Sequence, residues 1–171
     1  AMVTHPSRSL VGQHSKQVIM YLKLLEVKDI PRFVALCKNF HQASPYNNRD
    51  FSVEKVTTLA KSITASNKQD FIIITLVDDN DLTQGFLIGI TSEIPFSEEK
   101  VAMELAWWVE PQARGTRKSV EMVFAFKEWA KRVGCKVAQM SMIENTGTDK
   151  IDKLYIKAGL QRAEVNYIGE L

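Results

Sequence analysis

The sequence has few of the residues that mark metal-binding, disulfide-rich or nucleic-acid-binding proteins. Its 171 residues include two cysteines and three histidines, and these do not occur at metal-ligand spacing, so we expect no metal site. The widely separated Cys37 and Cys135 predict buried, reduced thiols and not a disulfide framework. With 22 basic and 20 acidic residues the formal net charge is +2, so no nucleic-acid partner is expected.

Long apolar runs are also missing. No run approaches the roughly 18 residues that a membrane span needs, and no signal-peptide pattern opens the chain, so we expect a cytoplasmic protein with no membrane partner. Ala1 before Met2 suggests a tag remnant, and the residues that come after it are polar and unpatterned. We therefore predict a tag remnant or unstructured extension over 1–20, and a single domain over 21–171. A chain that is 45% hydrophobic and 25% charged fits one globular domain.

The apolar patterns predict an α/β fold with an antiparallel first half. Alternating or β-branched runs predict strands at 21–27, 71–77, 84–92, 100–110, 136–142 and 163–168. Three- and four-residue spacings predict helices at 31–42, 52–65, 116–133 and 148–158, with Thr148 or Asp149 as the cap of the last. Gly89 predicts a bulge or close packing within its strand. The strand, helix and strand over 100–142 imply one parallel crossover.

The stretch from Lys100 to Val133 combines a strand, a loop with a single glycine, and a helix. Gly115 supplies a permissive turn, and Arg114, Arg117 and Lys118 place positive charge where the helix begins. The free N–H groups of a first helical turn bind anions, so this place suits a phosphate. One glycine is too few for a Walker loop or a dinucleotide fingerprint.

Two motifs resemble those of one enzyme superfamily. Residues 109–119, VEPQARGTRKS, resemble the acyl-CoA pyrophosphate loop of the GNAT N-acetyltransferases, and residues 154–160, LYIKAGL, resemble their late helix-to-strand motif. The element order over 21–171 is similar as well. The resemblance implies a GNAT-like mixed, mostly antiparallel central sheet with a splayed parallel strand pair and about four helices. The stretches 41–46 and 104–108 more weakly resemble members associated with bacteriophage genomes.

The resemblance also implies acetyl-CoA as co-substrate and a set of residues that bind it. Backbone groups of the strand would pair with pantetheine, the loop would hold the pyrophosphate, and an asparagine after the next strand, or Thr148 in its place, would contact pantetheine. Arg117 stands where the family usually has glycine or alanine, so its side chain either crowds the pyrophosphate or reaches a CoA phosphate. The cofactor-binding residues expected are Trp107, Trp108, Val109, Gln112, Ala113, Arg114, Gly115, Thr116, Arg117, Lys118, Ser119, Asn145 and Thr148.

Two catalytic residues are implied by the same resemblance. Tyr155 matches the tyrosine that protonates the departing CoA thiolate, and a phenol with a pKa near 10 is protonated at neutral pH. Glu104, on the strand before the loop, is either the base that accepts the proton of the amine or a solvated strand residue; strict alternation places it with Ala106 and Trp108, and a bulge would reverse its face.

The acceptor is an amine that the sequence does not identify. His41, Ser44 and Tyr46 lie where the first two predicted helices join, the region that shapes the acceptor pocket in the family. The predicted function is direct acetyl transfer from acetyl-CoA to a small-molecule or protein amine by a monomer or homodimer. The alternative is a non-catalytic module that binds acyl-CoA or a protein partner.

Overall fold

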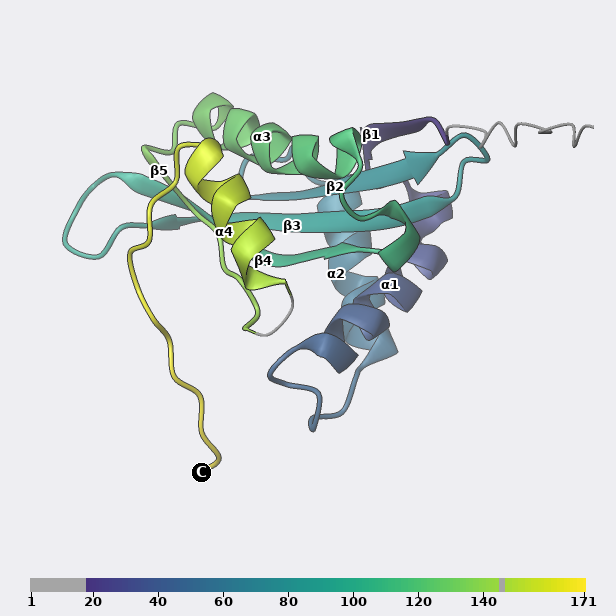
Figure 1. The fold of residues 1–171 in the computed structure, drawn as a ribbon, viewed down its shortest axis with the longest axis horizontal. Helices are drawn as coiled ribbons and strands as arrows, with labels where there is room; N and C mark the ends of the chain where they lie inside the picture. The colour runs from purple at the N-terminus through teal and green to yellow at the C-terminus, as the bar shows by residue number, and fades with distance from the viewer. Residues whose placement is uncertain (1–17, 145–146) are drawn as a thin grey trace, which may run out of the picture.

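A computed structural model describes residues 18–144 and 147–171, in which a five-stranded sheet carries helices on both faces (Figure 1). The strands lie in the order β1-β2-β3-β4-β5; β1 to β4 are antiparallel neighbours, and β4 and β5 are parallel. The predicted α/β fold with a mixed, mostly antiparallel sheet and four α-helices is therefore confirmed. The strands are Met20–Leu24 (β1), Phe71–Asp78 (β2), Thr83–Glu93 (β3), Lys100–Val109 (β4) and Val137–Gln139 (β5). The helices are Ile30–Ala43 (α1), Val53–Ala65 (α2), Arg117–Arg132 (α3) and Thr148–Lys157 (α4), with 3-10 turns at Val27–Asp29 (η1) and Pro111–Ala113 (η2).

The two faces of the sheet bury separate cores, which explains the continuous apolar run of β2. Ile72 and Ile74 pack with Phe126 and Trp129 of α3, whereas Ile73 between them packs among the residues of α1 and α2. Successive side chains of a strand point to opposite faces, so a strand covered on both sides has no polar alternation. The helix α4 packs beside α3 on the same face, through Tyr155 and Ala158.

A β-bulge in β4 decides which way Glu104 points. Ile88 of β3 pairs with Ala106, and the next residue, Gly89, pairs with Glu104, so Leu105 is the extra residue. Of the two alternatives that the sequence left open, the structure shows the bulge, which reverses the face of Glu104. Ala106 lies in the core under α1 and α2, while Gly89, opposite Glu104, faces Phe126 of α3. A Cβ at Gly89 would lie 2.7 Å from Phe126 Cε2, which confirms the close packing expected there.

The parallel strands part shortly after they begin. The pairs Val101 with Val137, Ala102 with Ala138 and Met103 with Gln139 make up the whole ladder between β4 and β5. From Glu104 onward β4 runs on without β5 beside it, so the predicted strand over 136–142 is formed only over Val137–Gln139. Within the described residues, no strand pairs with the second half of β4 on this edge, as the predicted splayed pair requires.

The prediction of a last strand over 163–168 is wrong. Residues 160–171 form no regular element, and Val165 and Tyr167 are 79% and 95% exposed. An alternating pattern makes a strand only where a sheet edge offers hydrogen-bond partners, and β5 offers only three residues. Near its end the segment is held by Glu170, which accepts hydrogen bonds from Asn48 and Arg49 after α1.

Two smaller predictions also need correction. The first strand ends at Leu24 and not at residue 27, because the chain turns into η1 there. The cap of α4 is Gly147, with a φ of 81°, and not Thr148 or Asp149. A left-handed φ is the conformation that glycine adopts most readily, so the helix begins by a backbone turn and without a side-chain cap. By contrast, the expected N-cap Ser52 accepts a hydrogen bond from the Lys55 N–H of α2.

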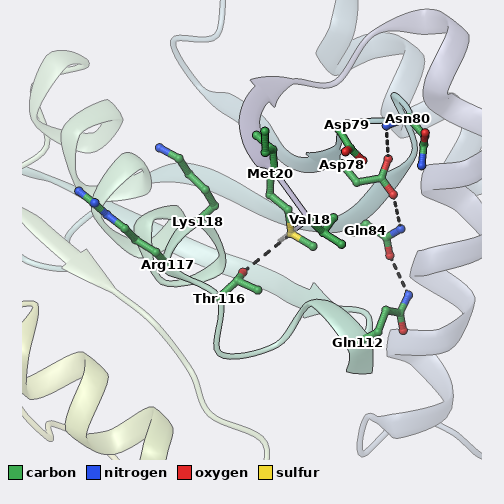
Figure 2. Close-up of a pocket in the computed structure, with 11 residues that line it drawn as sticks. Val18, Met20, Asp78, Asp79, Asn80, Gln84, Gln112, Thr116, Arg117 and Lys118 are labelled. Carbon is green, nitrogen blue, oxygen red and sulfur yellow. Dashed lines mark hydrogen bonds between the residues drawn. The ribbon is translucent and has the colours of Figure 1, made fainter. Parts of the chain in front are cut away.

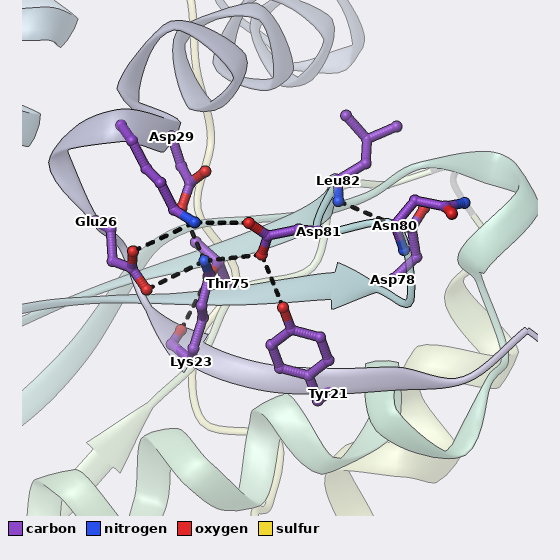
Figure 3. A network of polar contacts seen from close by, with 10 residues as sticks. Tyr21, Lys23, Glu26, Asp29, Thr75, Asp78, Asn80, Asp81 and Leu82 are labelled. Carbon is purple, nitrogen blue, oxygen red and sulfur yellow. Dashed lines mark hydrogen bonds and ion pairs between the residues drawn. The ribbon is translucent and has the colours of Figure 1, made fainter.

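A polar network fastens the sheet edge β1 to the turn between β2 and β3 (Figure 3). Asp81 in this turn accepts hydrogen bonds from Lys28, Tyr21 and Lys23 at 2.6, 2.8 and 3.3 Å. These donors, Lys28 first, lower the pKa of the Asp81 carboxyl. β1 is an edge strand, and these contacts add to its pairing with β2.

Candidate active site

The loop after β4 is built by backbone constraints. Gly115 has a φ of 72°, and a Cβ placed there would meet no atom within 4 Å, so the glycine is required by conformation and not by space. Ala113 before it is fully buried. Thr116 then caps α3: its hydroxyl donates to the Ala113 carbonyl at 2.9 Å and accepts from the Ser119 N–H at 3.2 Å.

The first turn of α3 is able to receive an anion. Within the described ranges, no hydrogen bond is made by the backbone N–H groups of Thr116, Arg117 and Lys118. The Ser119 N–H already donates to the Thr116 hydroxyl, and the Ser119 hydroxyl donates to the Thr116 carbonyl. Free N–H groups and the positive end of the helix dipole together favour a phosphate at this place.

The basic side chains around the loop are already oriented. Arg117 extends along α3 with its side chain 92% exposed, and its Nε lies 3.0 Å from Glu121, so it does not fill the space in front of Gly115. Lys118 contacts the same carboxylate at 2.5 Å. Arg114 folds back over the Trp108 ring at 4.8 Å and donates from Nε to the Val109 carbonyl. Of the two arrangements open for Arg117, the structure therefore shows the outward one.

A cavity of about 740 Å³ lies on the β1 side of this loop (Figure 2). Three polar residues of its lining form a chain of hydrogen bonds. Gln112 Nε2 donates to Gln84 Oε1, and Gln84 Nε2 donates to Asp78 Oδ2, each at 2.8 Å. Burial acts to raise the pKa of Asp78, but hydrogen bonds from Gln84, Leu82 and Asn80 outweigh it and lower the pKa. Gln112 thus links the loop to Gln84 of β3 and, through Gln84, to Asp78 at the end of β2.

The second candidate centre is the fork between β4 and β5. Glu104 and Tyr155 reach it from β4 and α4, and both contact the backbone of Ser141, which comes after β5. The Ser141 N–H donates to Glu104 Oε2 at 3.0 Å, and the Tyr155 hydroxyl donates to the Ser141 carbonyl at 2.8 Å. Trp107 packs against Tyr155, with ring centroids 6.3 Å apart. The structure therefore places side by side the two residues for which the sequence suggested catalytic roles.

Both titratable groups at the fork are perturbed. Burial raises the pKa of the Glu104 carboxyl to about 7, against the opposing effect of the Ser141 N–H. Burial, and secondly the nearby charge of Glu104, raises the pKa of the Tyr155 phenol above its ordinary value. At neutral pH the site thus holds a carboxyl near its midpoint beside a protonated phenol. A base is most effective when its pKa lies near the working pH.

The tryptophans of β4 occupy opposite faces. Trp108 packs against the core under α1 and α2, and its Nε1 lies 3.4 Å from Glu110 Oε1. Trp107 lies on the α3 and α4 side, where its Nε1 is buried and has no hydrogen-bond partner within the described ranges. Val109 is buried in the core under α3. Of the expected pantetheine contacts after β5, Asn145 lies outside the described residues and Thr148 begins α4.

The three residues expected at the acceptor pocket lie at the end of α1. The Ser44 hydroxyl donates to the His41 carbonyl at 2.8 Å and accepts from the Tyr46 N–H, so it closes the helix. The His41 ring lies 5.5 Å from that of Phe51, and Tyr46 is 60% exposed. Tyr46 is thus the most available of the three for a ligand.

The sequence did not single out Ser141 or Gln84, although both organise the candidate site. Ser141 acts through its backbone, which leaves no residue-type signal. Gln84 stands in a strand pattern, and only the tertiary pairing with Gln112 shows its place. The cysteines were predicted correctly: both are free and buried, and burial raises the pKa of Cys37 to about 12.

Two further observations concern metal binding and membrane-spanning helices. Over 18–144 and 147–171, no group of three or more His, Cys, Asp or Glu side chains is arranged to hold a metal ion. Within the same ranges, none of the helices has the length and apolar character needed to span a bilayer.

An α/β fold whose parallel strands part, and whose longer strand leads through a loop into a helix N-terminus, is the acetyltransferase architecture that the two motifs implied. The family model described as an acetyltransferase (GNAT) domain matches residues 20–157, most of the chain. The chain therefore belongs to the GNAT acetyltransferase family, and the predicted enzyme class, an N-acetyltransferase, is confirmed. A search of curated protein sequences finds no match, and the weaker resemblance to bacteriophage members stays a prediction.

Solved structures share the fold at low identity. Glucosamine-6-phosphate N-acetyltransferase from Arabidopsis thaliana is 14% identical, with a TM-score of 0.69, over 89% of this chain and 98% of that one. The aminoglycoside N-acetyltransferase AAC(6')-Iy, solved in complex with CoA, is 12% identical, with a TM-score of 0.69, over 92% and 97%. The aminoglycoside acetyltransferase meta-AAC0020 from an uncultured soil metagenomic sample, in complex with sisomicin, is 16% identical, with a TM-score of 0.65, over 89% and 96%.

Proposed function

We propose that this protein transfers the acetyl group of acetyl-CoA directly to the amine of a small molecule. The observation that carries the proposal is the fork, where β4 loses β5 as its partner after Met103. Glu104 and Tyr155 lie where these two strands part, and the α3 N-terminus follows the far end of β4. An extended ligand with a phosphate end fits such a path, because strand backbone satisfies amides and the helix end satisfies phosphates. The similar structures that act on glucosamine 6-phosphate and aminoglycosides favour a small-molecule acceptor over a protein.

In the proposed reaction the chain supplies position and proton transfer. The N–H groups of Thr116, Arg117 and Lys118 would hold the pyrophosphate, and the unpaired edge of β4 would align the pantetheine arm. The neutral amine attacks the thioester carbonyl and gives its proton to Glu104. Tyr155 protonates the departing thiolate. No covalent enzyme intermediate is needed, because alignment of the two substrates converts the transfer into an effectively unimolecular step.

Calorimetry and a CoA-release assay test the proposal. Acetyl-CoA is titrated into the protein, and free thiol is then measured with an amine panel that includes glucosamine 6-phosphate and an aminoglycoside. Saturable binding and amine-dependent thiol release are expected. Binding without turnover by any amine would instead favour the non-catalytic module, and no binding would refute both.

The role of the loop is tested by charge removal with a matched control. Arg117→Ala removes an exposed guanidinium at the N-terminus of α3, and Lys131→Ala removes an exposed ammonium near its C-terminus; each pairs with a glutamate of the same helix. If the loop holds phosphate, Arg117→Ala weakens acetyl-CoA binding several-fold and Lys131→Ala does not. Equal affinity in the two variants would remove Arg117 from the phosphate site.

A further inference from the structure

The backbone of Ser141 occupies a position that no side-chain motif indicates. It comes two residues after the last residue of β5 that pairs with β4, where the parallel ladder has stopped. Its N–H donates to Glu104 and its carbonyl accepts from Tyr155, at 3.0 and 2.8 Å. Two side chains therefore take the place of the strand partner that the Ser141 backbone lacks.

The surroundings leave the carboxyl and the phenol as the titratable groups that act on each other. From β3, the residue opposite Glu104 is Gly89, and the α3 residue packed against Gly89 is Phe126, neither of which titrates. From α4 comes Tyr155 itself, which is buried, whereas Glu104 is partly exposed, so its charge acts on the phenol through surroundings less polar than water. The basic side chain that α3 directs toward α4, Lys127, lies near the same end of α4 as Tyr155, where it donates to the carbonyl of the C-cap residue Ala158.

We propose, building on the acetyl transfer proposed above, that the Ser141 backbone is a positioning element that holds Glu104 and Tyr155 close together. Proton uptake by Glu104 then changes how readily the Tyr155 hydroxyl loses its proton. While Glu104 is charged, its field disfavours a phenolate and Tyr155 keeps its proton. When Glu104 accepts the proton of the amine, the field disappears and Tyr155 gives up its proton more readily. The acid is thus strengthened at the moment when the thiolate forms.

The proton balance of this sequence closes. The amine nitrogen bonds to the acetyl carbon and loses one proton to Glu104, while the carbon–sulfur bond breaks and its electron pair leaves on sulfur. The thiolate takes the Tyr155 proton and departs as CoA thiol. Glu104 then holds one extra proton and Tyr155 lacks one, and exchange through water returns both to their starting states. The net transfer is one proton from nitrogen to sulfur.

The first test measures the coupling without any turnover. The carbon-13 signal of the Tyr155 ring carbon that bears the hydroxyl is titrated in the wild type and in Glu104→Gln, which keeps an acceptor for the Ser141 N–H but carries no charge. The Tyr155 titration is expected to move to lower pH by about one unit, as for loss of a nearby charge at a partly exposed site. Glu121→Gln, on the exposed face of α3, is the control and leaves Tyr155 unchanged. An unchanged Tyr155 titration in Glu104→Gln would overturn the proposal.

The second test removes the donor of the positioning element. Ser141→Pro deletes the N–H and keeps the carbonyl, whereas Ser141→Ala keeps both. The acid limb of the kcat/KM profile is expected to lie about one pH unit higher in Ser141→Pro than in Ser141→Ala, because the lost N–H favoured the charged carboxylate. Coincident limbs would overturn the role of Ser141. If Ser141→Pro does not fold, as circular dichroism would reveal, the Tyr155 titration decides. A wild type that binds no acetyl-CoA would refute the proposed function alone, since the Tyr155 titration needs no ligand.

Discussion

The raised pKa of the Glu104 carboxyl predicts that the stability of the fold falls as the pH rises toward neutrality. Its carboxyl pKa rises from an ordinary 4.5 to about 7 on folding, a difference of about 2.5 units. The folded chain therefore binds more protons than the unfolded chain between these values, and stability falls as pH rises through this window. At about 1.36 kcal/mol per unit, the full effect is about 3 kcal/mol, which the partial exposure of Glu104 reduces.

Urea unfolding at several pH values between 4.5 and 8, monitored by tryptophan fluorescence, measures this effect. Glu104→Gln cannot ionise, so the difference in unfolding free energy between this variant and the wild type is expected to grow in its favour by about 2 to 3 kcal/mol across the window. Comparison of the two proteins cancels the contribution of the histidines.

A second glutamate provides the control. The Lys118 ammonium lowers the pKa of Glu121, so above about pH 5.5 Glu121 is ionised in both states, and over that part of the range Glu121→Gln should differ from the wild type by a constant amount. A constant difference for Glu104→Gln as well would show that the Glu104 carboxyl is not desolvated. The same result would remove the physical basis for its role as a base near neutral pH.

Three further predictions concern single residues. Tyr155→Phe should lower kcat roughly 100-fold while the calorimetric affinity for acetyl-CoA changes little, and Tyr167→Phe, at an exposed ring, should leave both unchanged. Gly89→Ala should lower the unfolding free energy by about 1 to 3 kcal/mol in urea, because its Cβ would lie 2.7 Å from Phe126; wild-type stability would refute the packing described. Gly115→Ala should cost about 1 kcal/mol from its positive φ and weaken acetyl-CoA binding, and unchanged affinity would show that the loop does not hold the ligand.

Most of the fold could be predicted because each element arises from a local pattern. Three such local signals are the β-branched run of β2, the Ser52 cap of α2 and the glycine after α3. Each predicts its element without information from distant residues. The strand predicted at 163–168 failed for the opposite reason. A strand is defined by its neighbour, and no local pattern reports whether a free edge lies within reach.

The features of the candidate site also differ in whether local sequence or tertiary structure determines them. The loop conformation is set locally by Gly115 and Thr116, so the sequence could predict the loop and the helix start that is expected to receive an anion. The direction of Glu104 depends on the bulge at Leu105, which alternation alone leaves undecided. The desolvation that raises its pKa comes from packing between elements far apart in the sequence, and only tertiary structure supplies it.

The fork also links architecture to chemistry. After Gln139 the chain no longer pairs with β4, so its backbone groups need other hydrogen-bond partners. Glu104 and Tyr155 provide them at Ser141, so the two groups proposed to move protons also support the chain where the strands part. A variant that truncates either side chain therefore changes the cleft as well as the chemistry. Glu104→Gln, which preserves the acceptor, separates the two effects: a loss confined to kcat belongs to the charge, and a loss in acetyl-CoA affinity belongs to the cleft.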